Sequence, residues 1–288
     1  MMRQRRPPSD PARGGRVGLT VILGWPCLML GIFMLVPFML LIRVSLAPAD
    51  VEQLWGQGVT LAAFGAMQQY GVMSAIGYSL VYALAIAALA LCLAFPLTWF
   101  ITGMTRRGQI GGLIFLLSTL ALSDVLIAFS WQVMLARRQW IAQWLLATGL
   151  LGRSKSLVPG TGAVLYCLLY ISLPFTVLLL YPALSRLDRS YLEAARPLGA
   201  TPVRSFFTLV IPLARMPIMM AFARSSITTL GAYTGPLVLG RPENWPLSVI
   251  IGKVALSAQN MPLSAARALT LLLALTLVLI ARRGRRVG

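Results

Sequence analysis

The chain has 288 residues, of which 58% are hydrophobic and only 11% are charged, and its mean hydropathy is +0.80. Because soluble domains carry about a quarter charged residues, this composition excludes a soluble globular protein and predicts an integral membrane protein. The net charge of +18 does not indicate nucleic acid as a partner, because the basic residues gather at the ends of hydrophobic runs, as the positive-inside rule predicts.

The absence of two sequence features limits the catalytic and binding chemistry that the chain can perform. The chain contains no histidine, which removes the most common general base and metal ligand. It also lacks a Gly-x-x-x-x-Gly-Lys-Ser/Thr loop, the sequence that cradles nucleotide phosphates. We therefore expect no metal, no ATP site and no other cofactor within this chain.

The chain begins with a basic tail at residues 1–18, which holds five arginines. Six hydrophobic runs follow, each able to provide the ~20 mostly apolar residues of a membrane-spanning helix. The predicted spans are residues 19–46, 78–102, 110–135, 161–184, 213–240 and 264–281. The sequence therefore predicts an all-α membrane protein with six transmembrane helices in a single domain at residues 19–284.

The basic residues predict the orientation of these spans. An even number of spans places both termini on one side, and that side then carries 15 of the 25 Lys and Arg residues while the other carries 8. By the positive-inside rule both termini are cytoplasmic. On the outer side, Trp140 and Trp144 are four residues apart and share one helix face, which predicts a short interfacial helix.

A polar loop at residues 185–212 separates the fourth and fifth spans on the inner side. Ser190 stands three residues before Glu193, the spacing of a capping box that starts a helix. Gly199 can end this helix in the left-handed conformation. The first half of the loop is therefore predicted to be a short capped helix.

The second half of the loop predicts another short helix. Thr201 is followed by Pro202, the combination of an N-cap residue with a proline at the first helical position. Pro212 lies where this helix is expected to stop or bend, since proline cannot donate the hydrogen bond of a continuing helix.

This loop resembles the EAA loop of ABC importer permeases. The resemblance rests on Glu193-Ala194-Ala195, three further residues, Gly199, nine further residues and then Leu209-Val210-Ile211-Pro212. It implies a cytoplasmic coupling-helix loop that docks on a cytosolic ABC ATPase. The implied coupling residues are Glu193, Ala194, Ala195, Gly199 and Ala200. Pro197 departs from the pattern, because it lies inside the first helix. An ordinary capped helical hairpin is the alternative.

Residues 230–240 resemble the spermidine/putrescine-type branch of these permeases, although Ala232 stands where that branch usually has an acid. The resemblance implies a transport subunit of the bacterial inner membrane that is not itself an enzyme. It would translocate a small polar solute, polyamine-like or related, which an extracytoplasmic binding protein delivers. The implied partners are a second permease, alike or different, and an ATPase dimer that binds ATP and Mg.

Two charged residues lie deep inside the predicted spans, where a buried charge is costly and indicates a functional role. Asp124 lies about 14 residues into the third span and Arg224 about 11 residues into the fifth. At a rise of ~1.5 Å per residue these positions are about 21 Å and 17 Å from the inner end. We therefore expect the two side chains to neutralise each other or to share one aqueous cavity.

Four other residues are candidates for the substrate path. Gly and Pro can break a helix where the backbone lines a cavity, and an aromatic residue near the end of a span either anchors the interface or lines the path. The candidates are Trp131, Tyr233, Gly235 and Pro236.

Two other classes of protein remain open at this stage. The first is a membrane-embedded enzyme that uses Asp124 as an acid or base, although the predicted spans contain no second mid-membrane carboxylate. The second is a transporter or scaffold outside the ABC class that carries the polar loop by chance. Co-purification with an ATPase would distinguish both from a permease.

Overall fold

A computed structural model describes residues 12–50, 54–66, 71–136, 147–148, 157–187 and 201–284. All regular elements within these ranges are helices, which confirms the all-α prediction. The principal helices are α1 (Ala12–Ser45), α3 (Val72–Gly103), α4 (Arg106–Leu120), α5 (Asp124–Met134), α7 (Thr161–Leu184), α11 (Arg215–Leu230), α13 (Leu247–Leu256) and α14 (Met261–Gly284). The short elements are α2 (Ala62–Gly65), α9 (Pro202–Ser205), a π-helix (Phe206–Val210), α10 (Ile211–Leu213), α12 (Thr234–Leu239) and a 3-10 turn (Pro242–Asn244).

Three of these helices are long and apolar enough to cross a membrane, namely Gly24–Ser45 within α1, then α3 and α7. The number rises to five if each of two bent helix pairs forms one span. The fourth predicted span, residues 161–184, coincides with α7, which continues through Pro174 without interruption. The second predicted span lies inside α3.

The third predicted span is not the continuous helix that the sequence indicated. It divides into α4 and α5, which meet at 90°. α4 ends at Leu120, and Ser123 starts the next helix. The backbone of Ser123 is extended, and its hydroxyl accepts a hydrogen bond from the Val125 amide at 3.4 Å, which caps α5. Asp124 therefore begins a new helix, and a depth measured along a straight helix does not apply to it.

The fifth predicted span also differs from the expected helix. The helix that starts at Pro202 continues through the π-helix and α10, and it turns by 69° into α11 only after Leu213. Pro212 contributes to this irregular segment because it has no amide hydrogen to donate. At its other end α11 stops at Leu230, and the chain resumes as the short α12.

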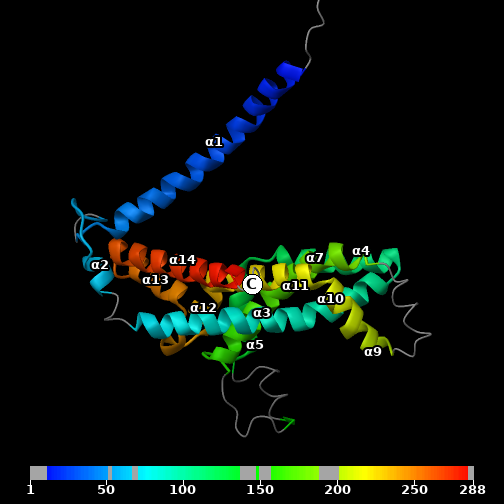
Figure 1. Ribbon diagram of the computed structural model, residues 1–288. Coiled ribbons are helices and arrows are strands. Elements are labelled where there is room, and N and C mark those ends of the chain that lie inside the picture. Colours follow the sequence, from blue (N-terminus) through cyan, green and yellow to red (C-terminus); the bar gives the residue numbers. More distant parts are fainter. Residues whose placement is uncertain are drawn as a thin grey trace, which may run out of the picture.

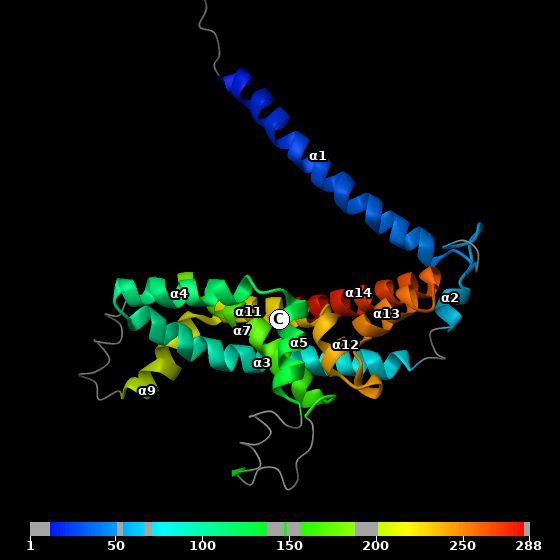
Figure 2. The ribbon, with the colours of Figure 1, turned by 180° about the vertical axis from the view of Figure 1, so that it is seen from behind.

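The helices pack lengthwise into one body. Figure 1 shows α3, α7 and α11 side by side, with α13 near one end and α4 and α9 at the other, and Figure 2 shows the same arrangement from behind. Four alanines in the middle of α3, between residues 83 and 94, are at most 2% exposed, and such small residues let neighbouring helices approach closely. They are Ala83, Ala87, Ala90 and Ala94.

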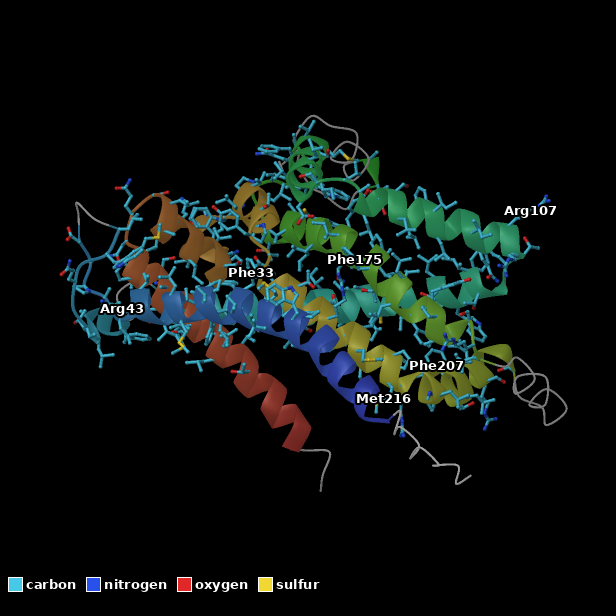
Figure 3. The ribbon with its side chains drawn as sticks, turned by 90° about the horizontal axis from the view of Figure 1, so that it is seen from above. Phe33, Arg43, Arg107, Phe175, Phe207 and Met216 are labelled. Atoms are coloured by element: carbon cyan, nitrogen blue, oxygen red, sulfur yellow. The ribbon has the colours of Figure 1, made fainter. Side chains whose placement is uncertain are left out.

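Helix α1 contacts α14 near its C-terminal end and otherwise points away from this body (Figures 1 and 2). Only 6% of its membrane-length segment is buried. Phe33, labelled in Figure 3, is 76% exposed. Within the described part of the chain, α1 is therefore the least enclosed of the long apolar helices.

Candidate functional site

A cavity of about 290 Å³ lies between α5, α7, α11 and the segment that follows α11. Two helix breaks meet at this cavity. One is the α4–α5 break that ends at Asp124, and the other is the non-helical segment Gly231–Tyr233 between α11 and α12. Because non-helical backbone at membrane depth is tolerated where it lines a cavity, the two breaks indicate a site rather than a packing defect.

The cavity wall carries one acid and one base. Asp124 has an exposed side chain at the first position of α5, where the helix dipole favours a negative charge. Arg224 lies on α11 and is partly buried. The structure thus brings these two predicted residues to one cavity, and it shows no ion pair between them.

The guanidinium of Arg224 is incompletely satisfied. Its Cζ lies 4.0 Å from the ring centroid of Phe175 on α7, a cation–π contact (Figure 3 labels Phe175). Its Nη1 is buried and has no hydrogen-bond partner. A cation–π contact contributes about 0.5–2 kcal/mol, whereas an unmade hydrogen bond at a buried charged group costs more than about 1–3 kcal/mol. The ring therefore does not replace the missing acceptor.

Several hydroxyl groups at the cavity already have partners. Ser172 of α7 and Ser225 of α11 form a buried hydrogen bond that joins these two helices. The Thr228 hydroxyl donates to the Arg224 carbonyl at 2.9 Å. The bond between Ser172 and Ser225 holds α7 against α11, whereas the bond from Thr228 lies within α11. Arg224 remains a strong donor on the wall that lacks an acceptor.

The segment after α11 is supported from behind by α13. The Ser248 hydroxyl donates to the Ala232 carbonyl at 2.6 Å. The ring of Tyr233, which lines the cavity, packs so closely on Gly252 that a Cβ at residue 252 would overlap it. Gly252 therefore permits the position of the Tyr233 ring.

The other candidates divide between the wall and its surroundings. Gly235 lines the cavity, and a Cβ there would come within 3.3 Å of the Cys167 sulfur. Pro236 is buried behind it in α12. Trp131 is not on the wall. It stacks on Tyr166, with ring centroids 6.2 Å apart, and meets Tyr170 edge-on at 6.1 Å, so that it joins α5 to α7.

Several residues that shape this site were not predicted from the sequence. Phe175 gave no signal, because a phenylalanine in an apolar run is unremarkable. Gly252 gave none either. Ser172 and Ser225 could have been found as polar residues within hydrophobic runs. No cluster of three or more His, Cys, Asp or Glu side chains suited to a metal occurs in the part of the chain that the structure describes.

The predicted coupling residues Glu193, Ala194, Ala195, Gly199 and Ala200 lie outside the described residues, as do Pro197 and the predicted interfacial helix. The structure begins again at Thr201. Its hydroxyl oxygen accepts a hydrogen bond from the Arg204 amide at 3.3 Å, and α9 starts at Pro202. The prediction of an N-cap followed by a proline is therefore confirmed.

The short helix after this cap is anchored on α3. Phe206 packs edge-on against Phe95, with ring centroids 5.3 Å apart, and against Trp99 at 6.2 Å. Phe206 begins the π-helix that leads through α10 to α11, the helix that carries Arg224. One continuous stretch of chain thus connects the end of the polar loop with the cavity.

Comparison with known proteins gives a consistent picture. The family described as "Binding-protein-dependent transport system inner membrane component" matches residues 112–284. The inner membrane ABC transporter permease protein YdcU of Escherichia coli (strain K12) is 32% identical over 226 residues, 72% of this chain and 70% of that protein. The spermidine/putrescine transport system permease protein PotB of the same strain is 24% identical over 262 residues, 91% of this chain and 94% of that protein.

A solved structure extends the likeness to the fold. A bacterial ABC transporter involved in the import of the acidic polysaccharide alginate contains a chain that superposes with a TM-score of 0.71. The match covers 94% of this chain and 96% of the other, with 17% sequence identity. At this identity the likeness concerns the fold alone.

Proposed function

This chain belongs to the family of binding-protein-dependent transport system inner membrane components, and from this membership we propose that it translocates a small polar organic solute, polyamine-like or related, as the permease subunit of an ATP-driven importer. The observation that carries the proposal is the extent of the family match. Residues 112–284 include both helix breaks and every residue on the cavity wall.

The proposed solute class has its support in the relatives. Permeases named for spermidine and putrescine match over 91–92% of this chain at 24–25% identity. The cavity offers one carboxylate, at Asp124, to bind an amine. We assign Asp124, Arg224, Tyr233 and Gly235 to the substrate path, with Pro236 and Trp131 supporting it.

We also propose the partners. Asp124 is exposed at the edge of the cavity, and a second permease, identical or different, would cover this side and complete the path. A solved relative is an alginate transporter in complex with a substrate-bound periplasmic protein, which supports delivery by a comparable extracytoplasmic protein. A cytosolic ATPase dimer would bind ATP and Mg and supply the energy.

The proposed arrangement in the inner membrane has six spans within residues 19–284, with the tail at residues 1–18 and the C-terminus in the cytoplasm. The loop at residues 185–212 then faces the ATPase, and Glu193, Ala194, Ala195, Gly199 and Ala200 form the docking helix. Closure of the ATPase dimer would move this loop, and α9, the π-helix and α10 would carry the movement to α11 as a rigid-body rotation.

The test is purification and reconstitution. The tagged chain, expressed with an ATPase, a second permease and a binding protein encoded beside it, should purify with the ATPase in stoichiometric amount. In proteoliposomes the complex should accumulate solute only when ATP and the binding protein are both present. A chain that assembles with no ATPase, or that transports without ATP, would contradict the proposal.

A further inference from the structure

We propose that the transported solute is zwitterionic, with an anionic group bound by Arg224 and an amine bound by Asp124. The inference rests on the proposed transport function and narrows its substrate class. It assigns to Arg224 the role of an anion-binding residue, so that a purely cationic polyamine would not be the preferred solute.

Arg224 has an unsatisfied hydrogen-bond donor. Its buried Nη1 has no hydrogen-bond partner, and among the residues that the structure describes the guanidinium lies against the neutral ring of Phe175. A guanidinium is always protonated and presents a planar fork that suits carboxylate or phosphate oxygens. Arg224 is only partly buried and lines the cavity wall, so that an anionic group of a solute in the cavity can reach its guanidinium and accept hydrogen bonds from it.

The charges on the cavity wall also favour a zwitterion. Thirteen residues line the cavity, and only Asp124 and Arg224 among them are charged. The net charge of these two residues is zero, and the wall residue Ala232 contributes no carboxylate. A solute with two or more ammonium groups would meet a single carboxylate and would bring positive charge close to Arg224. A solute with one amine and one acidic group matches both charges.

Asp124 and Arg224 do not neutralise each other directly. The structure shows no ion pair between the two side chains, although both line the same cavity. Asp124 stands at the beginning of α5 and Arg224 within α11, so that they line the cavity from different helices. A ligand placed between them can contact both.

Uptake by the complete importer tests this inference. The complex, with its ATPase and binding protein, is reconstituted in proteoliposomes that contain ATP. The external solution holds a bacterial metabolite extract with equal amounts of putrescine, 4-aminobutyrate and succinate, which share a four-carbon backbone and differ in the charge of their ends. Mass spectrometry then identifies the solutes that accumulate only with ATP.

We expect the accumulated solute to carry both an amine and an acidic group. Arg224→Gln should reduce its uptake about tenfold, the usual scale for losing a hydrogen bond to a charged group, whereas Arg224→Lys should retain more of it. Arg215→Gln is the matched control, because Arg215 is an exposed arginine on the same helix and outside the cavity. Its uptake should stay within about twofold of the unsubstituted complex.

Three outcomes would contradict the inference. Accumulation of putrescine or another solute without an acidic group overturns it and leaves the importer function intact. Full uptake by the Arg224→Gln complex does the same. Failure of the unsubstituted complex to accumulate any solute with ATP overturns the importer function and the inference together. If Arg224→Gln does not assemble, the identity of the solute carried by the unsubstituted complex still decides the question.

Discussion

The guanidinium carbon of Arg224 lies 4.0 Å from the centroid of the Phe175 ring, and this contact joins α11 to α7 at the cavity wall. It gives the arginine a partner that attracts its charge without neutralising it. The aromatic face therefore holds the side chain in place while its Nη1 remains free of protein acceptors. This combination suits a residue that must be positioned before it binds a solute.

Removing the ring tests the positioning. Phe175→Leu keeps an apolar side chain but loses the cation–π contact, so we expect the binding step of transport to weaken by about 0.5–2 kcal/mol. The change should appear as a raised KM for uptake with a similar maximal rate. Phe115→Leu on α4, where the ring is 67% exposed, is the control and should change neither value. An unchanged KM in Phe175→Leu would mean that the ring does not position Arg224.

A second prediction concerns the contact between Gly252 and Tyr233. Gly252→Ala should destabilise the fold by about 1–3 kcal/mol, because the added methyl group overlaps the Tyr233 ring. Thermal unfolding of the purified complex measures the effect. Tyr233→Ala should relieve the overlap, so the double variant should be more stable than Gly252→Ala with its tyrosine intact.

The control for this pair is Gly111→Ala on α4, where a Cβ would meet no atom within 4 Å. It should be neutral or slightly stabilising, since alanine is the better helix former by about 1 kcal/mol. Equal stability of Gly252→Ala and Gly111→Ala would show that the ring can move aside at little cost.

The third prediction concerns the cap of α9. Thr201→Ala removes the hydroxyl that accepts from the Arg204 amide and should destabilise the start of this helix by about 1 kcal/mol. If α9 transmits movement from the ATPase, solute-stimulated ATP hydrolysis should fall while the amount of assembled complex stays constant. Thr201→Ser keeps the acceptor and should behave as the unsubstituted protein does. Equal ATPase rates in Thr201→Ala and Thr201→Ser would show that this cap has no role in coupling ATP hydrolysis to transport.

Labelling of single cysteines tests the predicted topology. The single cysteines introduced by Pro8→Cys and by Arg286→Cys should not react with a membrane-impermeant thiol reagent in intact cells, whereas the one introduced by Ser154→Cys should react. The native cysteines must first be replaced, because Cys27 and Cys92 are exposed on their helices. Reaction of both terminal cysteines from outside would reverse the orientation and move residues 185–212 away from any cytosolic ATPase.

The fifth prediction revises the expected relation between Asp124 and Arg224. Since the structure shows no ion pair between them, Asp124→Asn and Arg224→Gln should each impair uptake, and the double variant should not recover. Uptake and yield of assembled complex are measured for all three. Recovery in the double variant would show that the two charges neutralise each other, as buried pairs do when the loss of one partner strands the other.

Much of the fold could be predicted because a long apolar run is a local property. Residues 161–184 were assigned as a span from their composition, and α7 has these bounds. The start of α9 was also predictable, because Thr201 and Pro202 form the N-cap and proline signal within two adjacent residues. The break at Ser123 has a comparable local signal, a capping residue followed by an acid, but the apolar residues on either side concealed it.

The residues that make up the site were harder to predict from the sequence. Asp124 and Arg224 are conspicuous as charges in hydrophobic sequence, and the cavity that contains both was expected. Their neighbours were not, because Phe175 meets Arg224 and Gly252 meets Tyr233 only after the helices pack. Such contacts between distant positions depend on helix rotation and depth, which hydrophobic periodicity does not specify.

The π-helix at Phe206–Val210 has a consequence for how this segment can change during evolution. A π turn holds one residue more than an α turn, so this helix contains the equivalent of a one-codon insertion. Deleting one codon here would restore regular α-helix and rotate the preceding residues by about 100° relative to α11. Proteins encoded without this codon would thus turn a different face of α9 toward its surroundings, without any substitution in α9 itself.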